Sequence, residues 1–328
     1  MKGATIRCTV TRGTGIESEH YIEACVIDES SHTLFDTANS NKPVCVRSIL
    51  KPFQLAAGFK QGLHKKYTFQ QNEIAFMSSS HNGEKIHTNT AQALMKRYNI
   101  SKDSLRCGTH PPYSKTIRRE LIKNSSKLDP IYNNCSGKHI AMILLSRLLE
   151  STDDSYESLD HPVQQTIFSY LNSIVKKIPD SIGIDGCSAP TPFYPLKSIA
   201  ILFKELAAQT REELSIIYNA IAKHPTYLAG EKRFDTDFIS TMFPKAITKV
   251  GGEAVRGISY KEGPSSIGIA LKVTDGNQRA CGPAALSIME HLGIITKKNL
   301  DSLLEHYHTK LYNHRKIHTG TIRCEITS

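Results

Sequence analysis

Strand patterns lie at both ends of this 328-residue sequence, and helical patterns fill the stretch between them. Runs of alternating and β-branched residues occur at 4–10, 18–28, 255–260, 267–274 and 319–327. Apolar residues recur at helical spacing from Ser48 to near Gly62 and at 72–77, 88–98, 137–150, 162–177, 196–208, 212–222 and 283–292. This order predicts an α/β (α+β) protein in which an antiparallel sheet is flanked by helices and accompanied by a helical region.

The sequence has no obvious internal boundary. No stretch rich in Pro, Gly or Ser divides it, and no internal repeat is visible. With 39% hydrophobic residues the chain can bury a sizeable core. We therefore expect one domain over residues 1–328.

The net charge of +10 raises the question of nucleic acid as a partner. The basic residues are spread along the chain and form no aromatic-interleaved motif, so we expect no nucleic-acid binding. No apolar run approaches the roughly 18 residues that span a bilayer, and the first residues lack a long apolar segment. We expect a soluble, unexported, cytoplasmic protein without membrane contact, with its eight cysteines reduced.

Ser48 and Lys51 have the S-x-x-K spacing, which places an amine within reach of a hydroxyl on one side of a helix. Pro52 cannot donate a backbone hydrogen bond to Ser48, so the chain should be irregular or barely helical there. Burial among Ile49, Leu50 and Phe53 would lower the pKa of Lys51 and make it a general base for Ser48.

This segment also has a structural interpretation. Lys51 can extend its amine from a core-facing helix to solvent while Ser48 caps the helix. The spacing itself is common, since Ser173 and Lys176 repeat it in a helix where a solvated surface is expected. The segment alone does not decide between these two interpretations.

Two further residues are candidates for proton transfer. Ser80 belongs to the loop Ser-Ser-Ser-His-Asn-Gly-Glu, and Ser80 and Asn82 have the S-x-N spacing of enzymes that use S-x-x-K. The alternative is a helix start, with a serine cap and Glu84 completing a capping box. Lys272 lies on a strand and flanks the site if its face lines the cleft, although a solvent-facing lysine is the usual case and no K-T-G triplet is present.

Cys135, Lys138 and His139 are spaced so that one helical face presents a thiol, an amine and an imidazole. Cys187 lies in a turn far along the chain. These residue types can bind zinc, although lone cysteines are more often buried apolar residues and lysine must lose a proton to bind a metal.

Taken together, a series of motifs in this sequence resembles the motifs of the asparaginase II family. These are RSxxKP at 47–52, SSH followed by Glu84, RCGTHPP at 106–112, NCSGKH at 134–139, DGCxxPTPxxPL at 185–196, HPxxxAGxxRxDT at 224–236 and KxxDGN at 272–277. They follow one another in the family's order along nearly the whole chain.

The resemblance implies a fold similar to serine β-lactamases and glutaminases, a homodimer, and hydrolysis of L-asparagine to L-aspartate and ammonia. By this resemblance Ser48 is the nucleophile activated by Lys51, and Ser80 acts with Lys272 in proton transfer. It also implies two further sets of residues. The zinc ligands would be Cys135, Lys138 and Cys187, and the groups around the substrate would be Arg47, His139 and Asp185.

Three other activities stay open. Glutamine differs from asparagine by a single methylene, so a glutaminase-like preference is possible. In a second class of amidohydrolase, zinc would activate a water and Ser48 would be a bystander. A penicillin-binding-like module would keep the fold and bind amides without turnover. In the serine mechanism, zinc would order the site and is not required for the chemistry.

Overall fold

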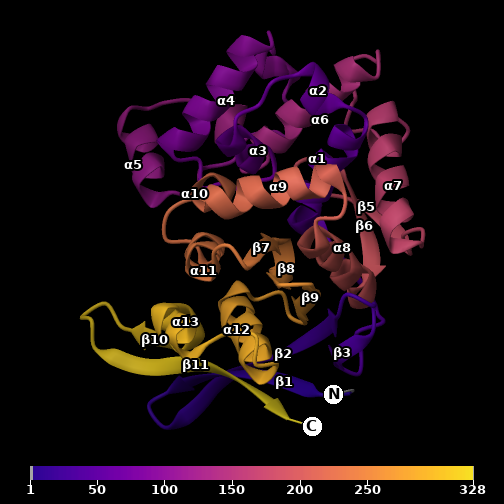
Figure 1. The fold of residues 1–328 in the computed structure, drawn as a ribbon. Coiled ribbons are helices and arrows are strands. Elements are labelled where there is room, and N and C mark those ends of the chain that lie inside the picture. Colours follow the sequence, from indigo (N-terminus) through magenta and orange to yellow (C-terminus); the bar gives the residue numbers. More distant parts are fainter. Residues whose placement is uncertain (1–2, 328) are drawn as a thin grey trace. The chain divides into compact units, whose positions relative to one another are not determined.

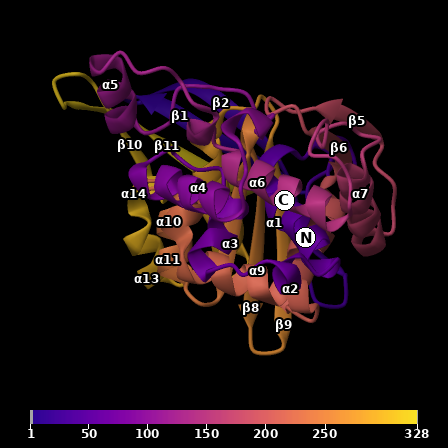
Figure 2. The ribbon, with the colours of Figure 1, turned by 90° about the horizontal axis from the view of Figure 1, so that it is seen from above.

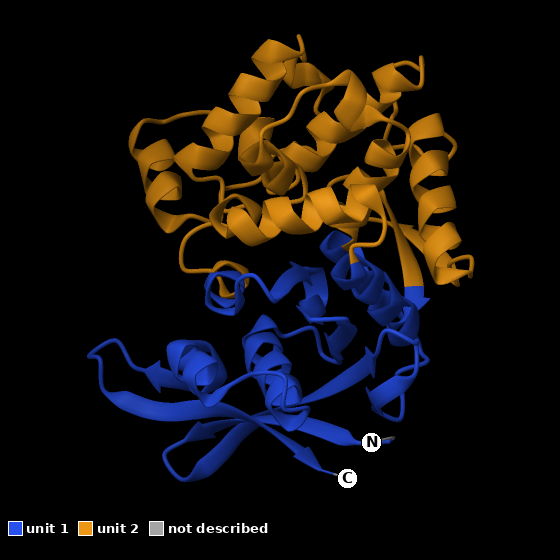
Figure 3. Cartoon of the chain, in the orientation of Figure 1, with its two compact units in different colours: residues 1–49, 194–208, 237–328 blue, residues 50–193, 209–236 orange. Residues whose placement is uncertain are grey.

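The computed structural model describes residues 3–327, and the chain folds into two compact units, coloured separately in Figure 3. The first unit consists of three stretches of chain, one ending at Ile49, one spanning Tyr194–Ala208 and one starting at Asp237. The second unit consists of Leu50–Phe193 and Gln209–Thr236. The expectation of one domain over residues 1–328 stays a prediction.

An eight-stranded antiparallel sheet forms the centre of the first unit, in the order β10-β11-β1-β2-β9-β8-β7, with β3 paired to β2 (Figure 1). Its strands are β1 (Thr5–Arg12), β2 (Gly15–Ile27), β3 (Thr33–Asp36), β7 (Ala246–Gly251), β8 (Val255–Glu262), β9 (Ser265–Val273), β10 (Thr309–Tyr312) and β11 (His318–Thr327). The long hairpin of β8 and β9 is visible in Figure 2. The strand patterns at both ends of the sequence thus belong to one sheet.

Helices α8 (Leu196–Ala208) and α12 (Cys281–His291) pack on opposite faces of this sheet. Gly257 of β8 lies under the Phe203 ring of α8, whereas its neighbour Arg256 donates to the sulfur of Cys281 in α12. Successive strand residues point to opposite faces, so the two helices cover different sides. The remaining elements of this unit are β4 (Pro43–Cys45), η1 (Arg47–Leu50), η4 (Gly252–Ala254), η5 (Gln278–Ala280), α13 (Lys297–Ser302) and α14 (Leu304–Tyr307), while α11 (Phe234–Met242) begins in the second unit.

The second unit is mainly helical. Helix α1 (Lys51–Lys60) is buried along its first nine residues, as expected for a helix whose side chains are apolar on every face. The other elements are α2 (Leu63–Lys66), α3 (Gln71–Met77), α4 (Lys85–Arg97), η2 (Lys102–Ser104), α5 (Lys115–Lys123), η3 (Pro130–Tyr132), α6 (Ser136–Leu148), α7 (Pro162–Val175), α9 (Glu212–Lys223), α10 (Pro225–Leu228) and the antiparallel pair β5 (Ser181–Ile184) and β6 (Pro190–Pro195). The predicted combination of an antiparallel sheet flanked by helices and a helical region is confirmed.

Cysteine chemistry differs in one place from the expectation. Cys8 and Cys324 face each other across β1 and β11 and form a disulfide, so the prediction of reduced thiols is wrong for this pair. The other six cysteines are free thiols. Within residues 3–327, no helix is long and apolar enough to cross a membrane.

Candidate active site

Lys51 is the first residue of α1, and its side chain is 1% exposed. Its Nζ donates to the carbonyl oxygen of Ser79 at 2.6 Å, to Oγ of Ser80 at 2.9 Å and to the carbonyl oxygen of Asn134 at 3.1 Å. Burial lowers the pKa of Lys51 because the charged amine loses its hydration. A neutral amine can keep two donor contacts and use its lone pair as a proton acceptor. Lys51 therefore has the environment of a general base rather than of a solvent-facing lysine.

Ser80 is held in a loop between α3 and α4. Its side chain is buried, and its backbone N–H donates to the carbonyl oxygen of Leu228 at 2.9 Å. The alternative of a serine-capped helix start is wrong, because α4 begins after Glu84 and the Glu84 N–H donates to Nδ1 of His87. The contact with Leu228 thus holds the Ser80 loop, and no serine of this loop caps α4. The hydroxyl of Ser80 accepts a hydrogen bond from Lys51.

Ser48 is half-buried and lies in η1, which runs directly into α1. The prediction of irregular or barely helical chain here is confirmed, since one 3₁₀ turn precedes the α-helix. Arg47 has a φ of 50°, in the left-handed region that non-glycine residues seldom adopt. Its guanidinium lies on Gly252, where a Cβ would be 2.8 Å from Arg47 Cζ. The backbone before Ser48 is therefore constrained by packing within the first unit.

Lys272 is half-buried near the end of β9 in the first unit. Its Nζ donates to the carbonyl oxygens of Glu253 at 2.6 Å and Val273 at 2.5 Å. Burial lowers the pKa of Lys272, while the charges of Glu253 and Asp275 oppose this shift. The hydroxyl of Ser80, in the second unit, receives its contact from Lys51, and a relay between Ser80 and Lys272 stays a prediction.

A cluster of polar groups around two cysteines is buried in the second unit. Cys135 precedes α6, and Lys138 and His139 lie in its first turns. Cys187 lies within the tight turn that begins at Asp185. Nζ of Lys138 lies 2.9 Å from Sγ of Cys187. The structure therefore brings together the three residues for which zinc binding is predicted.

The two sulfurs are inequivalent. A hydrogen bond from Cys135, together with the charge of Lys138, lowers the pKa of Cys187 well below the usual range. The same hydrogen bond and burial raise the pKa of Cys135. Burial opposes the charge on Lys138, but the sulfurs of Cys187 and Cys135 outweigh it and raise the pKa of Lys138. The charge of Lys138 and the sulfur of Cys187 thus stabilise each other.

His139 is oriented by a residue that the sequence patterns did not single out. Its Nδ1 is 2.8 Å from the hydroxyl of Tyr156, which also accepts from the backbone N–H of Arg106 at 2.8 Å. Burial lowers the pKa of His139, so the ring is neutral near pH 7. Its Nε2 is buried and has no hydrogen-bond partner among residues 3–327. Asp185, by contrast, is half-buried and caps its own turn through the N–H of Gly186.

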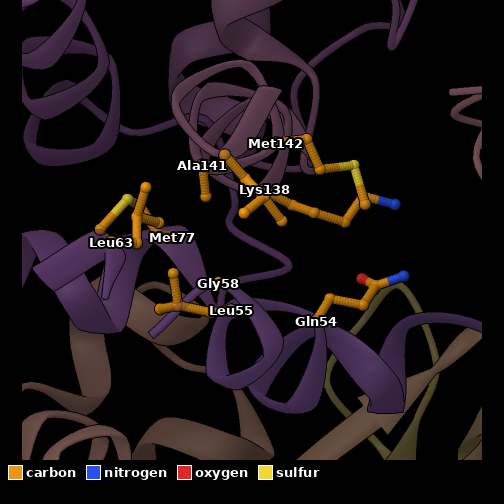
Figure 4. Close-up of a pocket in the computed structure, with 9 residues that line it drawn as sticks. Gln54, Leu55, Gly58, Leu63, Met77, Lys138, Ala141 and Met142 are labelled. Carbon is orange, nitrogen blue, oxygen red and sulfur yellow. The ribbon is translucent and has the colours of Figure 1, made fainter. Parts of the chain in front are cut away.

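The two sulfurs suit a soft divalent cation, because thiolate is a favoured ligand of such an ion. In the part of the chain that the structure describes, no group of three or more His, Cys, Asp or Glu side chains forms a metal site, so Lys138 would have to complete the set. Lys138 also borders a small cavity whose other walls are mostly apolar (Figure 4). Its aliphatic stem therefore packs in apolar surroundings while its amine is held at Cys187.

Comparison with known proteins identifies the family. The family model described as L-asparaginase II matches residues 8–324, nearly the whole chain. Comparison with individually curated proteins gave no match. Among solved structures, the crystal structure of Mglu in its native form in the presence of 4.3M NaCl is similar with a TM-score of 0.45 and 8% identity. That match covers 85% of this chain and 63% of the other, so the chain spans less than two thirds of that protein. The match over residues 8–324 establishes that the chain belongs to the L-asparaginase II family.

Proposed function

We propose that the protein is an L-asparaginase that hydrolyses L-asparagine to L-aspartate and ammonia through an acyl-enzyme on Ser48. Family membership supports the reaction class. The observation that carries the proposal is the buried amine of Lys51, which has a lowered pKa and follows Ser48 by three residues. A serine hydroxyl is a poor nucleophile until a nearby base takes its proton.

In the first stage, neutral Lys51 takes the proton of Ser48, and Oγ of Ser48 attacks the side-chain amide carbon. The C–N bond breaks, and the leaving nitrogen needs a proton to depart as ammonia. Ser80 is suited to deliver it because its Oγ lies 2.9 Å from the amine that received it. Lys272 is proposed as the second lysine of this relay. In the second stage, Lys51 takes a proton from a water molecule whose oxygen attacks the ester carbon. That proton passes to Oγ of Ser48 as the ester C–O bond breaks, which releases L-aspartate.

The groups around the substrate are proposed to be Arg47, His139 and Asp185. Zinc would be held by Cys135, Lys138 and Cys187, with Lys138 deprotonated. As a Lewis acid it would order the site and polarise nearby polar groups. The lowered pKa of Cys187 supports this assignment. To bind zinc, Lys138 would have to lose the proton that its 2.9 Å contact with Cys187 keeps on the amine. The protein is further proposed to act as a cytoplasmic homodimer, which equilibrium sedimentation can test.

The deciding experiment measures ammonia release from L-asparagine and L-glutamine by the wild type and by the Ser48→Ala and Lys51→Met variants. We expect release from asparagine by the wild type and a loss of roughly 10²-fold or more in both variants. Metal content is determined in parallel, before and after chelation. Retention of most activity by Ser48→Ala, together with its loss on chelation, would establish the zinc-activated water mechanism instead. Binding of asparagine without ammonia release would identify a non-catalytic module.

A further inference from the structure

We propose that Arg233 binds the α-carboxylate of the amide substrate and so selects amino-acid amides over simple amides. This inference rests on the proposed function, because it assigns a part of the same substrate. Arg233 is half-buried and lies in the second unit, in the loop before α11. None of the sequence motifs discussed above assigned it a role.

Arg233 is held in place without being neutralised. Its NH1 donates to Oδ1 of Asn82 at 2.8 Å, and its Cζ lies 5.8 Å from the ring centroid of Tyr113. Among residues 3–327, Arg233 makes no ion pair, whereas Arg97 and Arg147 each pair with a carboxylate. A positioned guanidinium without a carboxylate partner is suited to receive one from a ligand.

Asn82 holds the guanidinium of Arg233 with a neutral amide, so the positive charge of Arg233 is not cancelled. The Asn82 amide oxygen accepts from Arg233, and its nitrogen donates to Glu84 Oε1 at 2.9 Å and to the carbonyl oxygen of Glu231 at 3.2 Å. The neutral amide thus contacts both Arg233 and the carboxylate of Glu84. Gly230 packs so closely that a Cβ there would be 2.4 Å from Nδ2 of Asn82. The amide is therefore locked in the orientation that presents its oxygen to Arg233.

The same contacts connect Arg233 to the proposed catalytic base. Asn82 follows Ser80 by two residues, and Oγ of Ser80 accepts from Lys51. On the other side, the hydroxyl of Tyr113 accepts from Nδ2 of Asn134 at 3.4 Å, and the carbonyl oxygen of Asn134 accepts from Lys51 at 3.1 Å. These residues form one closed ring of contacts. It runs from Lys51, which is buried, to Tyr113, which is 50% exposed.

The chemistry of asparagine matches this arrangement. Only three bonds separate its reacting amide carbon from the α-carboxylate carbon, so both ends can be held by one small site. NH1 of Arg233 is used by Asn82, and the remaining N–H groups of the fork can bind a carboxylate. Lys51 would then act at the amide end while Arg233 fixes the charged end.

The test compares two substrates, L-asparagine and 3-aminopropanamide, which has the same amide and amine but no carboxylate. We expect Arg233→Met to raise KM for L-asparagine roughly 10- to 100-fold, the range of charge-assisted hydrogen bonds, with little change in kcat. Its kcat/KM for 3-aminopropanamide should not change. Arg233→Lys should recover part of the loss because it keeps the charge. Arg119→Met, an exposed change in α5, serves as the matched control and should alter neither substrate.

Equal losses on both substrates would overturn the inference, because they would mean that Arg233 only supports the Ser80 loop. An unchanged KM for L-asparagine would overturn it as well. A second readout does not depend on turnover: calorimetry of L-aspartate binding to Ser48→Ala with and without Arg233→Met. Weaker aspartate binding in the double variant would support the role of Arg233. If the wild-type protein also hydrolysed no amide, the proposed function would be refuted while the role of Arg233 stood. Amide hydrolysis with unchanged aspartate binding would refute only the role of Arg233.

Discussion

His87 should make the second unit sensitive to acid. It is buried in α4, where its Nε2 is 2.9 Å from the carbonyl oxygen of Thr226 and its Nδ1 accepts from the N–H of Glu84 at 3.1 Å. These contacts suit a neutral ring that carries its proton on Nε2. A second proton on Nδ1 would point at the Glu84 N–H. Burial accordingly lowers the pKa of His87 from 6.5 to about 4.

The direction of the effect follows from linkage. The unfolded chain takes up a proton at this histidine near pH 6.5, whereas the folded protein does so only near pH 4. The stability that His87 contributes is therefore complete above pH 6.5 and is lost as the pH falls toward 4. The loss amounts to roughly 2–3 kcal/mol at about pH 4.5 and approaches about 3 kcal/mol at lower pH.

Urea unfolding followed by far-UV circular dichroism, at about pH 8 and about pH 4.5, measures this loss. The comparison variant is His87→Gln, which can still donate to Thr226 but does not titrate. We expect the variant to be less stable than the wild type at high pH. In acid the difference in unfolding free energy should shrink or reverse by roughly 2–3 kcal/mol. His81 stacks on His87 and is present in both proteins. Its own effect on the pH dependence of stability therefore largely cancels in the comparison. A constant difference between the two pH values would refute the reasoning.

Three further changes have defined outcomes. Lys51→Met should reduce ammonia release by roughly 10²- to 10⁴-fold while the melting temperature is kept, and an active variant would exclude Lys51 as the base. Gly257→Ala would place a Cβ 1.9 Å from a ring atom of α8 and should cost about 1–3 kcal/mol or more in urea unfolding. At Gly186 an added Cβ would have no atom within 4 Å, so Gly186→Ala should change the unfolding free energy little. Equal losses in the two variants would contradict the close packing of Gly257 on α8. Cys187→Ser should lower the zinc content of purified protein, whereas Cys25→Ser should not; unchanged content in both would remove Cys187 from the site.

The elements that the sequence predicted best are those in which one pattern repeats over many residues. Helix α8 has the predicted limits because its apolar face is continuous from Leu196 to Ala208. Helix α5, at Lys115–Lys123, was missed because only Ile117 in it is buried. Strand β5 was missed because Ile182 and Ile184 are exposed, so burial does not follow hydrophobicity there.

Alternation along β9 does not predict which of its side chains are buried. Ala270 and Leu271 point to opposite faces of the sheet, and both are fully buried because helices cover both faces. Lys272 is half-buried only because it lies near the strand end.

The sequence predicted which side chains belong to the candidate site. It did not predict which backbone carbonyl groups accept their hydrogen bonds. Lys51 was expected to be desolvated, and it is. Two of its three acceptors are carbonyl oxygens, those of Ser79 and Asn134, which lie 28 and 83 residues further along the chain. Every residue has a carbonyl, so no sequence pattern marks which ones will meet an amine. Tyr156 escaped notice, and Arg233 was seen only as one letter of the HPxxxAGxxRxDT motif without a role. The reason is related, because the contacts that single them out are with side chains distant in sequence.

The pairing of β1 with β11 has a consequence for biosynthesis. Thr5 pairs with Thr327, so β1 must wait until more than 300 further residues have been made before β11 can pair with it. Until then β1 presents unpaired N–H and C=O groups that can bind other nascent chains. Contacts between residues so distant in sequence also form slowly. Yield in cells should therefore depend strongly on growth temperature and on chaperones that shield β1 during translation.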